Sequence, residues 1–180
     1  MRVITGTAKG RKLITLEGMD VRPTTDRVKE GLFSIIQFDL PGAMVLDLFA
    51  GSGQLGIEAL SRGASTCVFV DQSRKAQEVQ KQNLQHCNLM SRARVVLNDA
   101  LTFLAGTKDQ YDIVLMDPPY HKEMIPAALQ ALSGKLTENG VIICETGIRD
   151  ELPEQVGEFQ QYRTYQYGKI KLTTYRMVEA

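Results

Sequence analysis

The sequence predicts an α/β fold in which a mainly parallel sheet carries helices on both faces. Between residues 45 and 144, five short apolar runs alternate with helix-like segments. After residue 158, two β-rich runs meet at a glycine turn with no room for a helix between them. Parallel neighbours need helical crossovers, whereas antiparallel neighbours can be joined by a tight turn. We therefore expect seven strands, of which the last two form an antiparallel hairpin.

The chain of 180 residues is 43% hydrophobic and 23% charged, which indicates one ordinary globular domain over 1–180. Its formal net charge is zero, but seven basic and three acidic residues in 1–29 give that stretch +4 and the remainder −4. A basic arm of this kind suits contact with phosphates, although a solvated charged face gives the same count.

The sequence gives no sign of a membrane span, a signal peptide or a disulfide framework. The cysteines Cys67, Cys87 and Cys144 are odd in number and lack C-x-x-C spacing, so we expect reduced thiols. His86 and His121 have no partner at metal-ligand spacing, so no metal is expected. Together these features predict a cytoplasmic protein.

The first twenty residues suggest a small β-hairpin, with strands at 2–4 and 12–14 around a turn at 6–10 that have little to bury. A helix with a Thr or Asp cap follows from residue 22, with an apolar face of Val28, Leu32, Ile35 and Ile36. Residues 21–180 then form the core. Its expected strands are 45–49, 67–70, 94–97, 111–116 and 141–144, its helices 55–62, 74–85, 100–104 and 125–135, and its closing hairpin 158–168 and 169–178.

The tetrad Asp117-Pro118-Pro119-Tyr120 follows the apolar run 111–116, at the carboxyl end of a buried strand, where open α/β sheets bind ligands. Two prolines stiffen the loop and donate no amide hydrogen. The Asp117 carboxylate and the Pro118 carbonyl are then acceptors beside the flat Tyr120 ring, which suits a planar group carrying an NH2. A plain strand-ending turn is the alternative.

A glycine turn follows the first core strand, in the run 45–56. Gly51-x-Gly53-x-x-Gly56, with Asp71 twenty residues after Gly51, fits the dinucleotide fingerprint and would suggest a NAD-binding oxidoreductase. Asp47 argues against this, since a carboxylate there suits a cationic ligand better than a pyrophosphate. Asp71 could hold ribose hydroxyls and Asp99 an adenine amine, although Asp99 could equally cap a helix.

These motifs, in this order and spacing, resemble the class I S-adenosylmethionine-dependent methyltransferases that modify exocyclic amines of nucleobases. The front segment, with Gly10-Arg11-Lys12-Leu13 and the run 22–33, resembles the bacterial 16S ribosomal RNA guanine-N2 methyltransferase family (RsmD). The resemblance covers essentially the whole chain. It implies a Rossmann-like class I methyltransferase fold and S-adenosyl-L-methionine as the cofactor.

The resemblance also implies a partner and roles for individual residues. The partner would be 16S rRNA, possibly within the small ribosomal subunit or an assembly intermediate, bound through Lys9, Arg11 and Lys12. Catalysis would fall to Asp117, Pro118, Pro119 and Tyr120. The cofactor would contact Arg22, Thr25, Asp47, Phe49, Ala50, Gly51, Gly53, Asp71, Gln72, Asp99, Ala100 and Asp117.

The tetrad alone does not choose the base, because related tetrads serve adenine, cytosine, guanine and glutamine amines. A methyltransferase for DNA, for another RNA or for protein glutamine therefore stays open, as do the oxidoreductase and a catalytically silent RNA-binding module. Compactness favours RNA, since readers of DNA sequence usually carry an added recognition domain.

Overall fold

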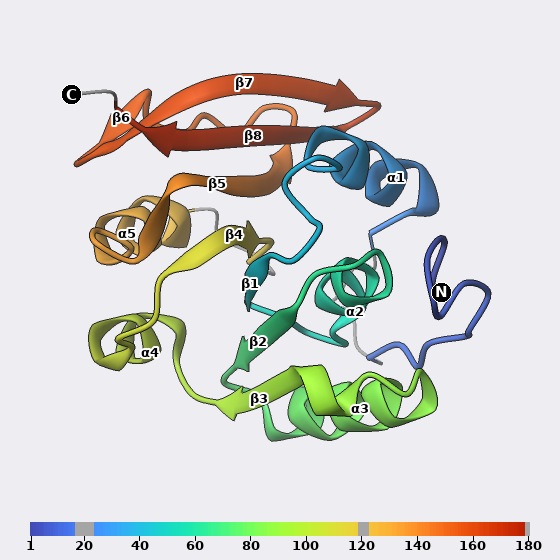
Figure 1. Cartoon of the computed structure of the whole chain (residues 1–180). Helices are drawn as coiled ribbons and strands as arrows, with labels where there is room; N and C mark the ends of the chain where they lie inside the picture. Colours follow the sequence, from blue (N-terminus) through green and yellow to red (C-terminus); the bar gives the residue numbers. More distant parts are fainter. Residues whose placement is uncertain (17–23, 119–122, 179–180) are drawn as a thin grey trace.

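The computed structural model describes residues 1–16, 24–118 and 123–178, and it contains an eight-stranded sheet with the order β3-β2-β1-β4-β5-β8-β7-β6. Neighbours from β3 to β5 are parallel, and β8, β7 and β6 are antiparallel additions at one edge (Figure 1). The strands are β1 (Met44–Leu48), β2 (Thr66–Asp71), β3 (Ala93–Leu97), β4 (Tyr111–Met116), β5 (Leu136–Gly147), β6 (Gln155–Val156), β7 (Phe159–Tyr167) and β8 (Ile170–Met177).

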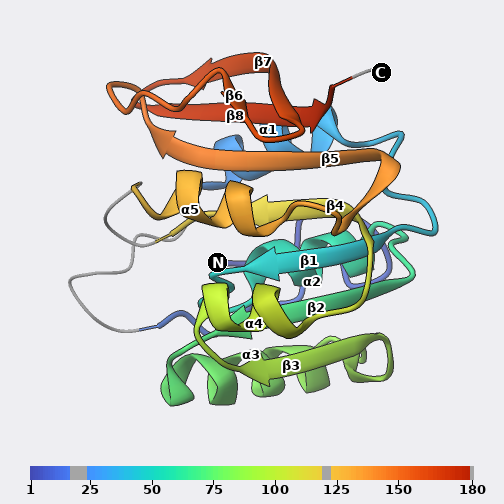
Figure 2. The same ribbon diagram turned by 90° about the vertical axis from the view of Figure 1, so that its left-hand side faces the viewer.

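Helices cover both faces of the sheet, and each face has its own apolar core. Helices α1, α2 and α3 lie on one face and α4 and α5 on the other, as Figures 1 and 2 show from two sides. The helices are α1 (Asp26–Ile35), α2 (Gln54–Ser61), α3 (Arg74–His86), α4 (Ala100–Gly106) and α5 (Met124–Ala131), with a short 3-10 turn η1 (Met90–Arg92). None of the described helices is long and apolar enough to cross a membrane.

The predicted alternation of strands and helices is confirmed, and the strand count is wrong by one. The extra strand is β6, whose two residues pair with β7. Helix α5 ends at Ala131, four residues earlier than expected, because Gly134 takes a left-handed φ of 76° and Leu136 already pairs with Tyr111. A pattern of apolar residues does not mark these boundaries.

Residues 1–16, called here the N-terminal arm, are antiparallel as expected, but among them only Arg2 and Lys12 form a bridge and no strand develops. The expectation that this segment has little to bury is wrong. Val3, Ala8 and Leu13 are at most 7% exposed and join the core on the side of α1, α2 and α3. The arm therefore packs against the helices, and backbone hydrogen bonds from Val3 to Arg11 and from Leu13 to Met1 connect its two limbs.

Candidate active site

Three carboxylates lie at the carboxyl ends of neighbouring strands in the middle of the sheet. Asp47 lies near the end of β1, Asp71 ends β2, and Asp117 directly follows β4. The order β2-β1-β4 brings the three strand ends side by side. Acidic groups gathered at this edge favour a ligand that carries positive charge.

Burial raises the pKa of the Asp47 carboxyl well above its ordinary value, because the side chain is 2% exposed. The negative charges of Asp117 and Asp71 act in the same direction. A hydrogen bond from the Gly56 amide to Asp47 Oδ2, 3.0 Å long, opposes the shift. A cation bound at this edge would relieve the repulsion among the three acids.

The glycine turn after β1 is folded tightly and held from several sides. Phe49, Gly51 and Gly53 have left-handed φ angles of 65°, 57° and 86°, which glycine adopts freely and phenylalanine rarely. Asp71 Oδ2 accepts a hydrogen bond from the Gly51 amide at 2.9 Å. Phe49 therefore has a strained backbone conformation within this turn. Strained residues of this kind cluster at functional sites.

A small pocket lies beside this turn, and five of the twelve predicted cofactor residues line it. Its volume of about 70 Å³ is below the ~300–1,000 Å³ of typical small-molecule sites, so it could hold only part of a nucleoside. Asp117 is not among its lining residues. The lining residues are Phe49, Val70, Asp71, Gln72, Asn98, Asp99, Ala100 and Met124.

Asp99 and Asp71 also stabilise the structure around them. Asp99 caps α4, accepting hydrogen bonds from the amide and hydroxyl of Thr102 at 3.1 Å, so the predicted alternative of a helix cap is confirmed. Asp71 accepts from the Ser73 amide with Oδ1 while Oδ2 holds Gly51. Each carboxylate oxygen has a second lone pair, so these contacts leave capacity for ribose hydroxyls or an adenine amine.

The tetrad is described only in its first half. Asp117 is half-buried and Pro118 is buried at the end of β4, whereas Pro119 and Tyr120, like Arg22, lie outside the described residues. The Asp117 charge contributes to the raised pKa of Asp47, which places the first acceptor of the tetrad within electrostatic reach of the glycine turn.

The segment before α1 is attached to the same edge of the sheet. Thr25 caps α1, accepting a hydrogen bond from the Val28 amide at 3.3 Å, as predicted. Sequence reasoning missed the neighbouring contact, in which Thr24 Oγ1 donates to Glu145 Oε1 at 3.1 Å. Glu145 is 8% exposed on β5, next to β4. The signal that could have found it is an acid within an apolar strand.

Helix α3 connects the glycine turn to the N-terminal arm. Asn83, 1% exposed, donates to the carbonyls of Ile14 and Ser52 at 3.0 Å and accepts from the Ile14 amide at 2.7 Å. Gln80 Nε2 donates to the Gly51 carbonyl at 2.8 Å. Two side chains of one helix therefore fix both segments.

Helix α2 anchors the other end of the arm through Glu58, which is fully buried. Its carboxylate accepts hydrogen bonds from the amides of Ile4 and Thr5, at 2.8 and 3.0 Å. It also pairs with Lys29 Nζ at 3.2 Å and Arg62 Nε at 2.8 Å. Burial lowers the pKa of the Lys29 amine, and the Glu58 charge opposes that shift. Sequence reasoning overlooked this anchor, although a glutamate among the apolar residues of α2 is a visible signal.

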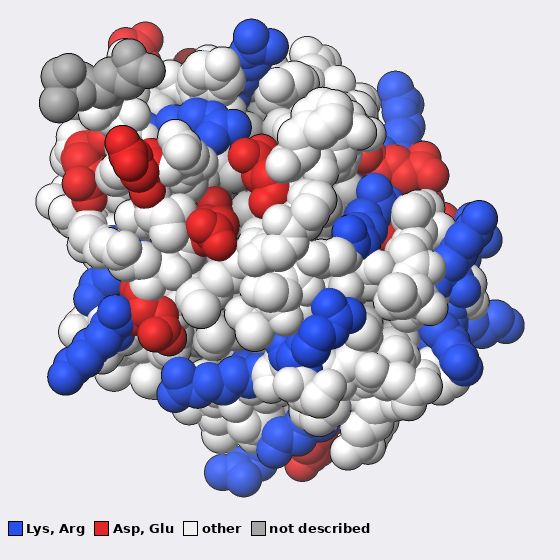
Figure 3. Space-filling view, in the orientation of Figure 1, with Lys and Arg blue, Asp and Glu red and all other residues white. Residues whose placement is uncertain are grey.

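Docking the arm in this way exposes its basic side chains. Lys9, Arg11 and Lys12 are all exposed. In Figure 3, Lys and Arg side chains gather at the right-hand edge, where Figure 1 shows the arm. The three thiols are free and buried, and within the described ranges no group of three His, Cys, Asp or Glu residues could hold a metal ion.

Comparison with known proteins decides the relationship. A family model described as Conserved hypothetical protein 95 matches residues 1–176. The chain belongs to this family. The family relationship agrees with the resemblance found in the sequence, because a relative named Ribosomal RNA small subunit methyltransferase D matches 98% of this chain.

Similar proteins come from Bacillus subtilis and Escherichia coli. YlbH of Bacillus subtilis is 42% identical over 181 residues, which cover 98% of each chain. Ribosomal RNA small subunit methyltransferase D of Escherichia coli K12 is 33% identical over 178 residues, covering 98% of this chain and 89% of the relative. The solved structure of Escherichia coli yhhF has a TM-score of 0.88 at 31% identity, covering 98% and 97% of the two chains.

Proposed function

We propose that this protein transfers a methyl group from S-adenosyl-L-methionine to the N2 amine of a guanine in 16S ribosomal RNA. The observation that carries the proposal is the convergence of Asp47, Asp71 and Asp117 beside the glycine turn. A ligand with an ammonium and a sulfonium group fits that charge, whereas a dinucleotide pyrophosphate would be repelled. The relatives named as rRNA methyltransferases support the reaction and the class of substrate.

The residues present fit the cofactor. Left-handed Gly51 and Gly53 let the turn approach its methionine part closely, near Asp47. Asp71 and Gln72 border the small pocket where the ribose would lie, and Asp99 and Ala100 border its adenine side. Arg22 or Thr25 would reach the cofactor carboxylate. When bound, S-adenosylmethionine supplies the activated methyl group.

The tetrad would prepare the nucleophile. An exocyclic amine is a poor nucleophile because its lone pair is delocalised into the ring. The Asp117 carboxylate and the Pro118 carbonyl would accept hydrogen bonds from the two N–H groups, which favours a pyramidal nitrogen and stabilises the positive charge that develops there. Pro119 would keep the loop stiff, and Tyr120 would stack on the base, which must leave its helix to enter. The proton lost after transfer can pass to Asp117 or to water.

The basic arm would contact the RNA backbone through Lys9, Arg11 and Lys12. Such contacts orient a substrate and make binding sensitive to salt, without selecting the base. We infer that the folded small-subunit RNA, alone or in an assembling particle, presents the target guanine.

Mass spectrometry of ribosomal RNA nucleosides from a strain that lacks this protein tests the function. We expect one N2-methylguanosine to disappear from 16S rRNA and to return when the intact gene is restored. An unchanged 16S nucleoside profile would contradict the proposal. Labelled cofactor offered to separate RNA, DNA and protein pools then distinguishes the rival amine methyltransferases. A thermal shift with S-adenosylhomocysteine but not with NAD excludes the oxidoreductase.

Cofactor affinity should depend on pH through Asp47. The raised pKa means that the folded protein disfavours ionised Asp47, so stability falls as pH rises from the ordinary carboxyl range through the folded-state pKa. A cationic ligand favours the ionised form, so affinity for S-adenosylmethionine should fall as pH drops through that pKa, by at most about tenfold per pH unit.

Calorimetric titration over a pH series checks this expectation. Asp47→Asn keeps an oxygen for the Gly56 amide, and we expect it to bind S-adenosylmethionine more weakly and with a flat pH profile. Equal pH profiles for the wild type and Asp47→Asn would contradict the assignment of a cation to this carboxylate.

A further inference from the structure

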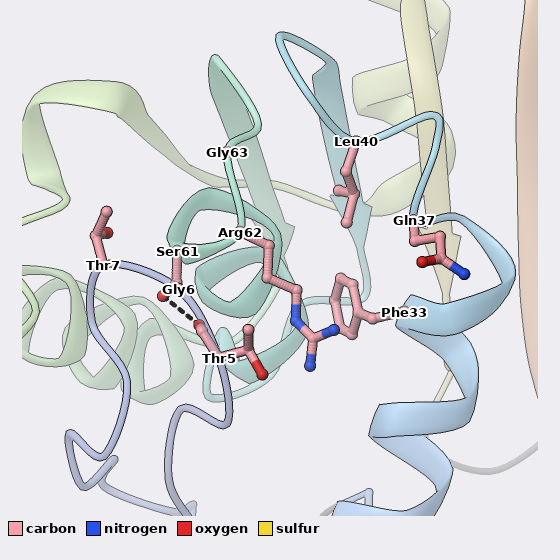
Figure 4. A pocket seen from close by; sticks show the side chains of 9 residues that line it. All are labelled: Thr5, Gly6, Thr7, Phe33, Gln37, Leu40, Ser61, Arg62 and Gly63. Atoms are coloured by element: carbon pink, nitrogen blue, oxygen red, sulfur yellow. Dashed lines mark hydrogen bonds between the residues drawn. The ribbon is translucent and has the colours of Figure 1, made fainter.

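A second hollow of the described structure shares no lining residue with the pocket beside the glycine turn. It measures about 600 Å³, within the usual ~300–1,000 Å³ range for ligand sites. It lies between the N-terminal arm, the end of α1 and the end of α2 (Figure 4). We call it the Arg62 pocket. It is lined by Thr5, Gly6, Thr7, Phe33, Gln37, Leu40, Ser61, Arg62 and Gly63.

Arg62 gives the pocket its chemistry. Its guanidinium lies 4.8 Å from the centroid of the Phe33 ring, and its Nε donates to Glu58. Among the described residues, neither terminal nitrogen of Arg62 has a hydrogen-bond partner. The side chain is only 17% exposed, so these donors are held in place at the pocket wall. A fixed guanidinium with two free N–H2 groups matches a phosphate.

The charges around Glu58 and the other residues that line the pocket also favour an anionic ligand. Glu58 is shared between Lys29 and Arg62, so one carboxylate faces two basic side chains. The Thr5 and Thr7 side chains are exposed at the rim and offer hydroxyl groups. The pocket therefore combines one cationic side chain, Arg62, with hydroxyl groups and the Phe33 ring beside the basic arm.

We propose that the Arg62 pocket binds a nucleotide of the RNA substrate other than the one that is methylated, with its phosphate on the Arg62 terminal nitrogens. This inference rests on the proposed function and adds a second point of contact to it. The eight residues of α2 separate the pocket from the glycine turn by about 12 Å, at 1.5 Å per residue. One RNA chain can span that distance while its target base lies in the active site.

The test compares a variant that fills the pocket with a matched control. Gln37→Trp places an indole at the pocket wall and leaves the contacts of Arg62 with Glu58 and Phe33 intact. Gln130→Trp adds the same side chain at an exposed position of α5, on the opposite face of the sheet. The indole would occupy space that the proposed nucleotide needs, so we expect Gln37→Trp to weaken binding of 16S rRNA fragments about tenfold. Its affinity for S-adenosylhomocysteine and its melting temperature should stay those of the wild type, as should every property of Gln130→Trp.

A second variant, Arg62→Gln, reports on the phosphate. We expect the slope of log affinity for single-stranded RNA against log salt to become shallower by about 0.7, the amount for one phosphate contact. A purely structural role for Arg62 would leave that slope unchanged. The pocket inference fails if the wild type binds and methylates RNA, Gln37→Trp has the RNA affinity of the wild type and Arg62→Gln has the salt slope of the wild type. The proposed function then stands. If the wild type binds no RNA, both fail.

A free nucleotide is the other source of the same chemistry. If the pocket serves free nucleotides, guanosine monophosphate raises the melting temperature of the wild type and not that of Gln37→Trp. That result, together with equal RNA affinity in the two proteins, would overturn the RNA assignment.

Discussion

Asp117→Ala is expected to lose methyl transfer while it still binds the cofactor. Removal of one preorganised hydrogen-bonding group that acts in the transition state typically costs about 10²- to 10³-fold in rate. The loss should appear in kcat, because this acceptor acts mainly as charge develops on the amine nitrogen. Single-turnover transfer of labelled methyl to RNA, with S-adenosylhomocysteine affinity measured in parallel, checks both halves of the expectation.

Asp109→Ala is the matched control for this prediction. Asp109 is an exposed acid just before the amino end of β4, whereas Asp117 follows its carboxyl end. We expect Asp109→Ala to turn over like the wild type. Near-normal turnover by Asp117→Ala would refute the role assigned to the tetrad, whatever the control does.

Glu58→Ala is expected to reduce the free energy of unfolding by about 3–5 kcal/mol, since removal of one partner leaves Lys29 buried without its counter-charge. The amides of Ile4 and Thr5 also lose their acceptor. Urea denaturation measures the loss. Buried Lys29 would then have a further lowered pKa, so part of the lost stability should return as pH rises toward the ordinary pKa of lysine.

The exposed ion pair between Arg2 and Asp26 provides the control. Its atoms lie 3.5 Å apart, but the side chains are 63% and 51% exposed, so water screens the pair. Asp26→Ala should leave the free energy of unfolding close to that of the wild type. A Glu58→Ala protein as stable as Asp26→Ala would show that Glu58 does not anchor the arm.

The sequence predicted the sheet well because its central strands are buried on both faces. The runs 67–70 and 113–116 are apolar without interruption, and this pattern is typical of parallel strands under helices. The helix cap at Thr25 was predicted for a similar reason, because caps depend on residues three positions apart. Local rules were sufficient wherever the partners are neighbours in the chain.

The contacts that hold the site together could not be predicted in this way. Glu58 accepts from Ile4 across 54 residues, Asn83 from Ile14 across 69, and Glu145 from Thr24 across 121. No periodicity connects such residues, since the fold alone brings them together. The acids at the strand ends were identified because topology places strand ends at one edge, while their supporting partners come from other elements.

The attachment of the arm at both of its ends affects how the chain can be shortened. A protein that began after residue 16 would leave the Asn83 amide and the Glu58 carboxylate facing gaps where the arm backbone now lies. It would also uncover the apolar surface of α1, α2 and α3 that Val3, Ala8 and Leu13 now cover. Such a fragment would lack part of its own interior, so the arm belongs to the folded domain and is not a removable extension.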